Sequence, residues 1–217
     1  MNSYQKDKVK IQEVAKSLPS DKSELLALAA GAVDTMHESI LCCDQESAFA
    51  AGTVYEAVVF KLNGGTFSGC MDSSNPNAGG NMVIEHCRAK KGEIPKWGQY
   101  GEFLLTVQGV RVRVVIGDGF GLFRIGFNFH VVDCNLPFIS ETGYRSHYDT
   151  AMGNRTVDEL ASMIIAEYLK NGRTLLNPNY RERCANQFQP IWLIDQLGTE
   201  TKKSEYQDQD GQMAFGF

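Results

Sequence analysis

The side chains best suited to binding or catalysis lie on two neighbouring segments in which charged and apolar residues alternate. Valines alternate with arginines over 110–114, and aromatic and aliphatic residues alternate with polar ones over 123–131. Successive side chains of a strand point to opposite faces, so a hairpin through 117–121 would gather the polar set on one side of a sheet. The predicted nucleic-acid-binding residues are Arg111, Arg113, Arg124 and His130. Guanidinium groups bind phosphates, although an antiparallel sheet with one solvated side produces the same pattern.

A second candidate site is the segment 140–149, which combines hydroxyls, carboxylates, a guanidinium and an imidazole. Glu141 or His147 is a candidate general base, and Arg145 is a candidate anion-binding group. The segment has no nucleophile-elbow or phosphate-loop spacing. A loop whose side chains bond to one another explains its composition equally well. The sequence therefore favours a protein that is not an enzyme, with this loop as the catalytic alternative.

The cysteines and histidines do not predict a metal site. None of the six cysteines forms a Cys-x-x-Cys pair, the close spacing that structural zinc sites use. His130 lies four residues before Cys134, but neither has a second ligand at a short spacing. We predict free thiols, no metal and no cofactor.

Charge and hydropathy limit the classes of partner. A net charge of −5 argues against a protein that coats duplex DNA by charge alone, but it leaves room for a local basic face. The first residues have no apolar core of the kind found in signal peptides, and the most apolar run, 25–32, is too short to span a bilayer. We expect a cytoplasmic protein without a membrane partner.

The pattern of helix and strand signals predicts an α+β protein. Residues 1–52 have helical spacing, with a helix beginning at Asp21 and Glu24 in a capping position. Residues 53–133 have the composition of a sheet, and 150–198 are helical again, with Thr156 and Glu159 forming a capping box.

Within the predicted sheet the turn signals separate five strands. The expected strands are 53–62, 82–87, 102–107, 110–116 and 122–132, and Gln108-Gly109 is expected to form a hairpin turn. Short connections of this kind favour an antiparallel five-stranded meander or small barrel. Residues 1–198 are thus expected to form a single α+β domain.

The last nineteen residues form a polar tether that ends in a hydrophobic tip. The segment 199–217 carries four acidic residues and two lysines before it closes on two phenylalanines. Chain ends that have nothing to bury are usually polar, so this flexible acidic tail is expected to bind a partner through its tip. The predicted partner-binding residues are Gln212, Met213, Phe215 and Phe217. The alternatives are a tip that docks on its own domain or an inert tip.

The tip resembles the hexapeptide by which bacterial replication and repair proteins bind the sliding clamp. That motif begins with glutamine and has apolar residues at its second, fourth and sixth positions, which Met213, Phe215 and Phe217 occupy here. Acidic residues before a terminal phenylalanine are also similar to the tail of single-stranded-DNA-binding proteins. Both resemblances imply a partner in DNA replication or repair, with Gln212 making polar contacts.

The favoured hypothesis is a DNA-metabolism accessory protein of bacterial, plasmid or phage origin. It would bind single-stranded DNA through the basic sheet face, with Trp97, Tyr100 or Phe120 stacking on bases, and would recruit a replication or repair partner through its tail. The first alternative is a non-enzymatic inhibitor or adaptor that binds a host protein. The second is a small enzyme that uses the 140–149 loop.

Overall fold

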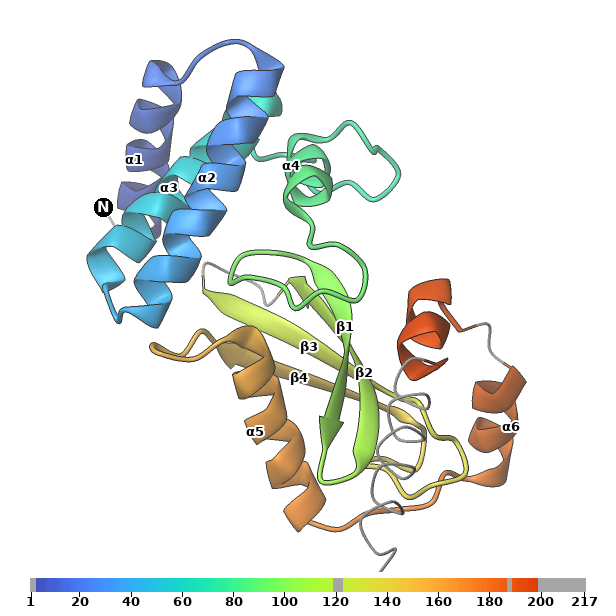
Figure 1. The fold of residues 1–217 in the computed structure, drawn as a ribbon. Coiled ribbons are helices and arrows are strands. Elements are labelled where there is room, and N and C mark those ends of the chain that lie inside the picture. Colours follow the sequence, from blue (N-terminus) through green and yellow to red (C-terminus); the bar gives the residue numbers. More distant parts are fainter. Residues whose placement is uncertain (1–2, 119–122, 187–188, 199–217) are drawn as a thin grey trace, which may run out of the picture.

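The computed structural model describes residues 3–118, 123–186 and 189–198, and it is an α+β fold as the sequence predicts (Figure 1). The helices are α1 (Ser3–Ser17), α2 (Lys22–Leu41), α3 (Gln45–Leu62), α4 (Gly79–Cys87), α5 (Val157–Lys170) and α6 (Pro178–Asn186). The strands are β1 (Gly101–Val107), β2 (Val110–Asp118), β3 (Arg124–Val131) and β4 (Tyr144–Thr150). A further helical segment covers residues 191–198.

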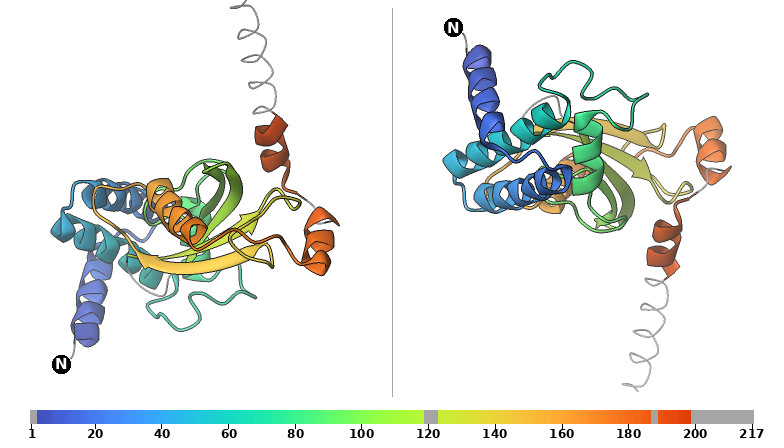
Figure 2. Two further views of the ribbon diagram at one scale, coloured as in Figure 1. Left: turned by 90° about the horizontal axis from the view of Figure 1, so that it is seen from below. Right: turned by 90° about the horizontal axis from the view of Figure 1, so that it is seen from above.

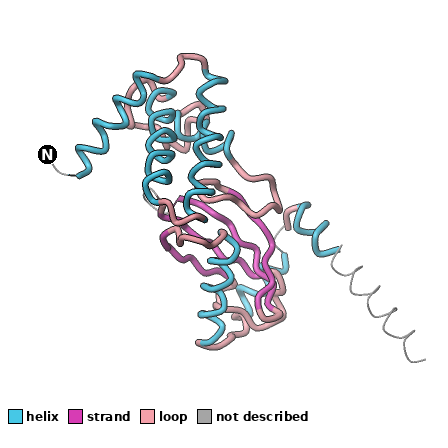
Figure 3. The backbone as a smooth tube through the Cα atoms, turned by 60° about the vertical axis from the view of Figure 1, so that its left-hand side comes forward, coloured by secondary structure: helices cyan, strands magenta, loops and turns pink. Residues whose placement is uncertain are grey.

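Helices α1 to α4 form a helical layer at one end of the molecule (Figures 1 and 3). Asp21 begins α2, as predicted, because its carboxylate accepts two backbone N–H groups of the first turn at 2.9 and 3.0 Å. Lys61, near the end of α3, donates to the carbonyl oxygens of Ala15 and Leu18 at 3.1 and 2.5 Å. These bonds satisfy carbonyl groups at the end of α1 and hold it along α3.

The four strands form one antiparallel sheet in the order β1-β2-β3-β4. Gln108 and Gly109 connect β1 to β2 with φ angles of 50° and 78°, the geometry of a type I′ hairpin turn. Helix α5 begins at the predicted capping box and covers one face of the sheet, as Figure 2 shows. Phe103, Phe127 and Phe129 are fully buried between the two. This core fixes which side chains point to the opposite, polar face of the sheet.

Two of the five predicted strands are wrong. Segments 53–62 and 82–87 belong to helices α3 and α4. Their β-branched residues favour strands in isolation, but Ala57 and Val58 are completely buried against neighbouring helices, and such packing overrides local propensity.

The sheet gains a strand where the sequence predicts a polar loop. Residues 144–150 form β4, whose side chains are mostly exposed on both faces and so lack the apolar alternation of a half-buried strand. Among the residues that the structure describes, the sheet therefore has four strands, and the barrel alternative is also wrong because β1 and β4 are its two edges.

A connector of residues 88–100 ties the helical layer to the sheet. Lys96 forms an ion pair with Asp34 of α2 at 2.7 Å, and the backbone N–H of Trp97 donates to His37 Nδ1 at 3.2 Å. The indole N–H of Trp97 donates to the carbonyl of Arg155 at 2.7 Å. One buried tryptophan thus joins α2 to the segment that precedes α5.

Candidate nucleic-acid interface

The predicted cationic residues all project from the sheet face opposite α5. Arg113 of β2 is paired with His130 of β3 in the strand register, and Arg124 lies opposite Thr150 of β4. Arg111 is two residues from Arg113 along β2, so its side chain lies on the same face. The hairpin therefore brings the four residues onto one surface.

Two of these arginines are bound to carboxylates of the same chain. Arg111 donates through Nε to Asp133 Oδ2 at 2.9 Å and through a second nitrogen to Oδ1, which makes a bidentate pair. Arg113 Nε lies 3.5 Å from Glu102 Oε2, and both side chains are only 20% exposed. Their charges are thus largely matched within the molecule.

The C-terminal helical segment covers part of the same face. Trp192 donates its indole N–H to Glu102 Oε1 at 2.9 Å, Gln196 donates to the carbonyl of Gly92 at 3.1 Å, and Leu193 is fully buried. Burial, aided by the neighbouring Arg113, lowers the pKa of His130 to about 4, so this imidazole is neutral at pH 7. Arg124, in contrast, is exposed.

The candidate catalytic residues are only partly brought together. Arg145 and His147 lie on the α5 side of β4, where the Arg145 guanidinium stands 4.5 Å above the ring of Tyr168. His147 Nδ1 is 2.9 Å from the Tyr168 hydroxyl oxygen. Glu141 is exposed in the turn before β4, and its carbonyl accepts the backbone N–H of Asn177. The two β4 residues thus pack around a helix side chain.

Across the described residues, no three His, Cys, Asp or Glu side chains are grouped in a way that could hold a metal ion. The described helices include none with the length and apolarity needed to cross a membrane. The predicted partner-binding residues Gln212, Met213, Phe215 and Phe217 lie outside the described residues, as does Phe120.

The structure also has a cleft between the helical layer and the sheet, which the sequence did not predict. It encloses about 870 Å³ and runs between α1, α3, the connector and the sheet, where residues 116–117 near the end of β2 and 123–125 at the start of β3 line it. Its described lining residues include three cations, Lys8, Lys10 and Arg124, and one carboxylate, Glu56. Aromatic residues of both layers also line it: Phe49, Tyr55, Phe67, Trp97, Tyr100 and Phe123. Trp97 and Tyr100, two of the stacking candidates predicted from the sequence, line this cleft, but Trp97 is only 2% exposed and has no free face for a base.

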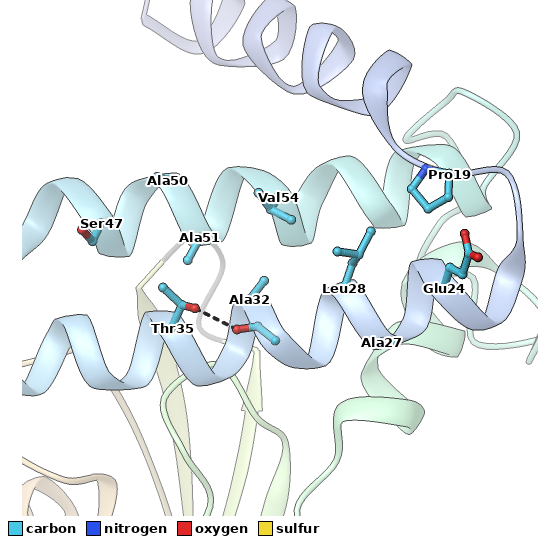
Figure 4. Close-up of a pocket in the computed structure, with 11 residues that line it drawn as sticks. Pro19, Glu24, Ala27, Leu28, Ala32, Thr35, Ser47, Ala50, Ala51 and Val54 are labelled. Carbon is cyan, nitrogen blue, oxygen red and sulfur yellow. Dashed lines mark hydrogen bonds between the residues drawn. The ribbon is translucent and has the colours of Figure 1, made fainter.

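A second hollow of about 940 Å³ lies on the outer side of the helical layer, between α2 and α3 (Figure 4). Small and aliphatic side chains such as Ala32, Ala51 and Val54 point into it, and Glu24 is the charged residue among those that line it. This apolar groove offers no cation to a phosphate, so it is a poor surface for nucleic acid.

Two protein-family models match this chain, and their limits follow its structural layers. Residues 10–86, which are most of the helical layer, match the model described as the KlcB N-terminal DNA-binding domain. Residues 100–198, which hold the sheet, α5 and the C-terminal helices, match the model described as the KlcB third domain.

The curated relatives carry the same name. Two proteins called Protein KlcB, both from Escherichia coli, are 44% identical to this chain over 185 and 184 residues. These alignments cover 85% and 83% of this chain but 40% and 45% of the relatives, so the chain spans less than half the length of the relatives it matches. No solved structure matches the chain.

Proposed function

We propose that this chain is an accessory protein that binds DNA and that the helical layer makes the primary contact. The observation that carries this proposal is the match of residues 10–86 to a DNA-binding domain model. That range ends within α4, before the connector to the sheet, so the matched segment corresponds to one structural layer.

The charge of the helical layer restricts how it would bind. Residues 10–86 contain four lysines and ten carboxylates, so a uniform coat of positive charge is excluded. Helix α1 concentrates cations, with Lys8, Lys10 and Lys16 within three turns, and Arg124 lies across the cleft from it. We assign the phosphate contacts to this side of the layer.

Fluorescence anisotropy of labelled 20-nucleotide DNA, single-stranded and duplex, tests the proposal over a series of salt concentrations. Lys10→Gln should weaken binding and lower the salt slope by about 1, as expected for one lost phosphate contact. Lys170→Gln is the matched control, because Lys170 lies at the far end of α5 and contacts only its neighbour Glu167 among the interactions described. Absence of binding at low salt would refute the proposal.

A finer part of the function concerns the tail. We propose that Gln212, Met213, Phe215 and Phe217 recruit a replication or repair protein, for which the sliding clamp is the candidate. The resemblance of the tip to the clamp-binding hexapeptide supports this role. A chain ending at Gly211 should keep its affinity for DNA, or bind more tightly, and should lose any binding to the clamp. Equal clamp binding by both chains would refute the role of the tip.

A further inference from the structure

We infer that the cleft between the helical layer and the sheet binds unpaired nucleobases of single-stranded nucleic acid. The inference rests on the proposed function and adds to it a site and a ligand class. The volume of about 870 Å³ lies within the range of pockets that enclose most of their ligand.

The mouth of the cleft presents an aromatic surface built by both layers. Phe49 of α3 and Phe123, which precedes β3, meet edge to face with ring centroids 4.7 Å apart and an angle of 83° between the rings. Phe49 remains 52% exposed, an unusual exposure for a phenylalanine in a globular protein. Since every base has an aromatic face, such a side chain can stack on single strands of any sequence.

The backbone conformation of Phe123 also supports a ligand site at this position. Its φ angle is 64°, in the left-handed region that bulky residues rarely adopt. The Phe123 carbonyl accepts the backbone N–H of Ala151 at 2.8 Å, which together with the Phe49 contact holds the residue in place. Unfavourable backbone angles of this kind are concentrated at ligand sites.

The charges around the cleft fit a nucleic acid backbone. Lys10 of α1 and Arg124 of β3 are exposed and come from different layers, and Lys8 of α1 also lines the cleft. The described lining residues include three cations and one carboxylate, Glu56. The cleft is therefore locally cationic, although the helical layer as a whole is acidic. The combination of a cationic groove and aromatic side chains is typical of single-strand binding sites. A duplex keeps its base faces stacked internally and therefore cannot use Phe49 in this way.

The test compares two probes, a labelled dT20 strand and a blunt-ended duplex of 20 base pairs, by anisotropy with the full chain. Phe49→Ala should weaken dT20 binding by about 5- to 150-fold, the loss expected for one base stack, and change duplex binding by less than about twofold. Phe49→Tyr should restore dT20 binding. Tyr180→Ala, which removes an exposed aromatic residue of α6, should leave both affinities unchanged.

The outcomes separate this inference from the proposed function. If Phe49→Ala weakens both probes equally, or neither, the cleft does not bind unpaired bases while DNA binding itself still stands. If the wild-type chain binds neither probe, the proposed function fails and the inference fails with it. Should Phe49→Ala not fold, photocrosslinking of 5-iodouracil-substituted dT20 to the wild-type chain replaces it. Crosslinks within 49–56 or 97–100 would support the site, and crosslinks confined to other segments would overturn it.

Discussion

Trp192 and Glu102, ninety residues apart in the sequence, are joined by a hydrogen bond of 2.9 Å from the indole N–H to the carboxylate. The same carboxylate lies 3.5 Å from Arg113, so the C-terminal helical segment rests on an ion pair of the polar sheet face. Through this contact, the end of the described chain determines how much of the predicted cationic surface is open.

Removal of that hydrogen bond should loosen the C-terminal segment. Trp192→Phe keeps an aromatic side chain but removes the indole N–H that Glu102 accepts, so we expect the free energy of unfolding to fall by about 1–2 kcal/mol. Urea unfolding measures the loss, and hydrogen exchange should show faster exchange over 191–198. Ile191→Ala, at a side chain that is 69% exposed, is the control and should change stability by less than about 0.5 kcal/mol. Equal losses in the two variants would contradict the prediction.

The partly buried imidazole of His130 should make stability depend on pH. Its pKa of about 4 lies below the ordinary value of 6.5, so between these values the unfolded chain binds more protons than the folded one. The contribution of neutral His130 to the free energy of unfolding is therefore fully present above pH 6.5 and is lost as the pH falls toward 4. Unfolding curves at a series of pH values should decline less steeply for His130→Gln than for the wild type. His37, whose pKa is also lowered by burial, should leave part of the slope in that variant.

The Arg111–Asp133 pair offers a test of the predicted sheet interface. If this face contacts phosphates, Asp133→Asn should tighten the binding of single-stranded DNA by roughly two- to eightfold at 0.1 M salt, because Arg111 loses the negative charge that it neutralises. Arg111→Ala should weaken binding by a similar factor. Anisotropy measures both, and unchanged affinity in the two variants would exclude Arg111 from the interface.

Two helical glycines should respond oppositely to alanine. A Cβ at Gly79 would lie 2.6 Å from the carbonyl oxygen of Val59, whereas a Cβ at Gly31 would have no atom within 4 Å. Backbone cannot move aside easily, so Gly79→Ala should destabilise the helical layer by about 1–3 kcal/mol. Gly31→Ala should stabilise it by about 0.5–1 kcal/mol through helix propensity. Thermal or urea unfolding checks both, and a stabilising Gly79→Ala would show that α4 does not pack closely on α3.

Local sequence patterns, which span only a few residues, were sufficient to predict much of the fold. The caps at Asp21 and Thr156, the Gln108-Gly109 turn and the alternation over 110–114 predicted helix starts and a hairpin that the structure confirms. These features depend on hydrogen bonds and side-chain directions within one or two turns of chain, so the sequence by itself determines them.

Other features depend on contacts between residues that are far apart in the sequence, and only the tertiary structure determined them. Segment 53–62 became helix because other helices bury it, and 144–150 became a strand because β3 supplies its hydrogen bonds. Likewise, Arg111 and Arg113 are matched by carboxylates of other segments, and the cleft is assembled from α1, α3, the connector and the sheet. Burial and charge pairing between residues far apart in sequence leave no local pattern, and for this reason the candidate interface emerged only from the folded chain.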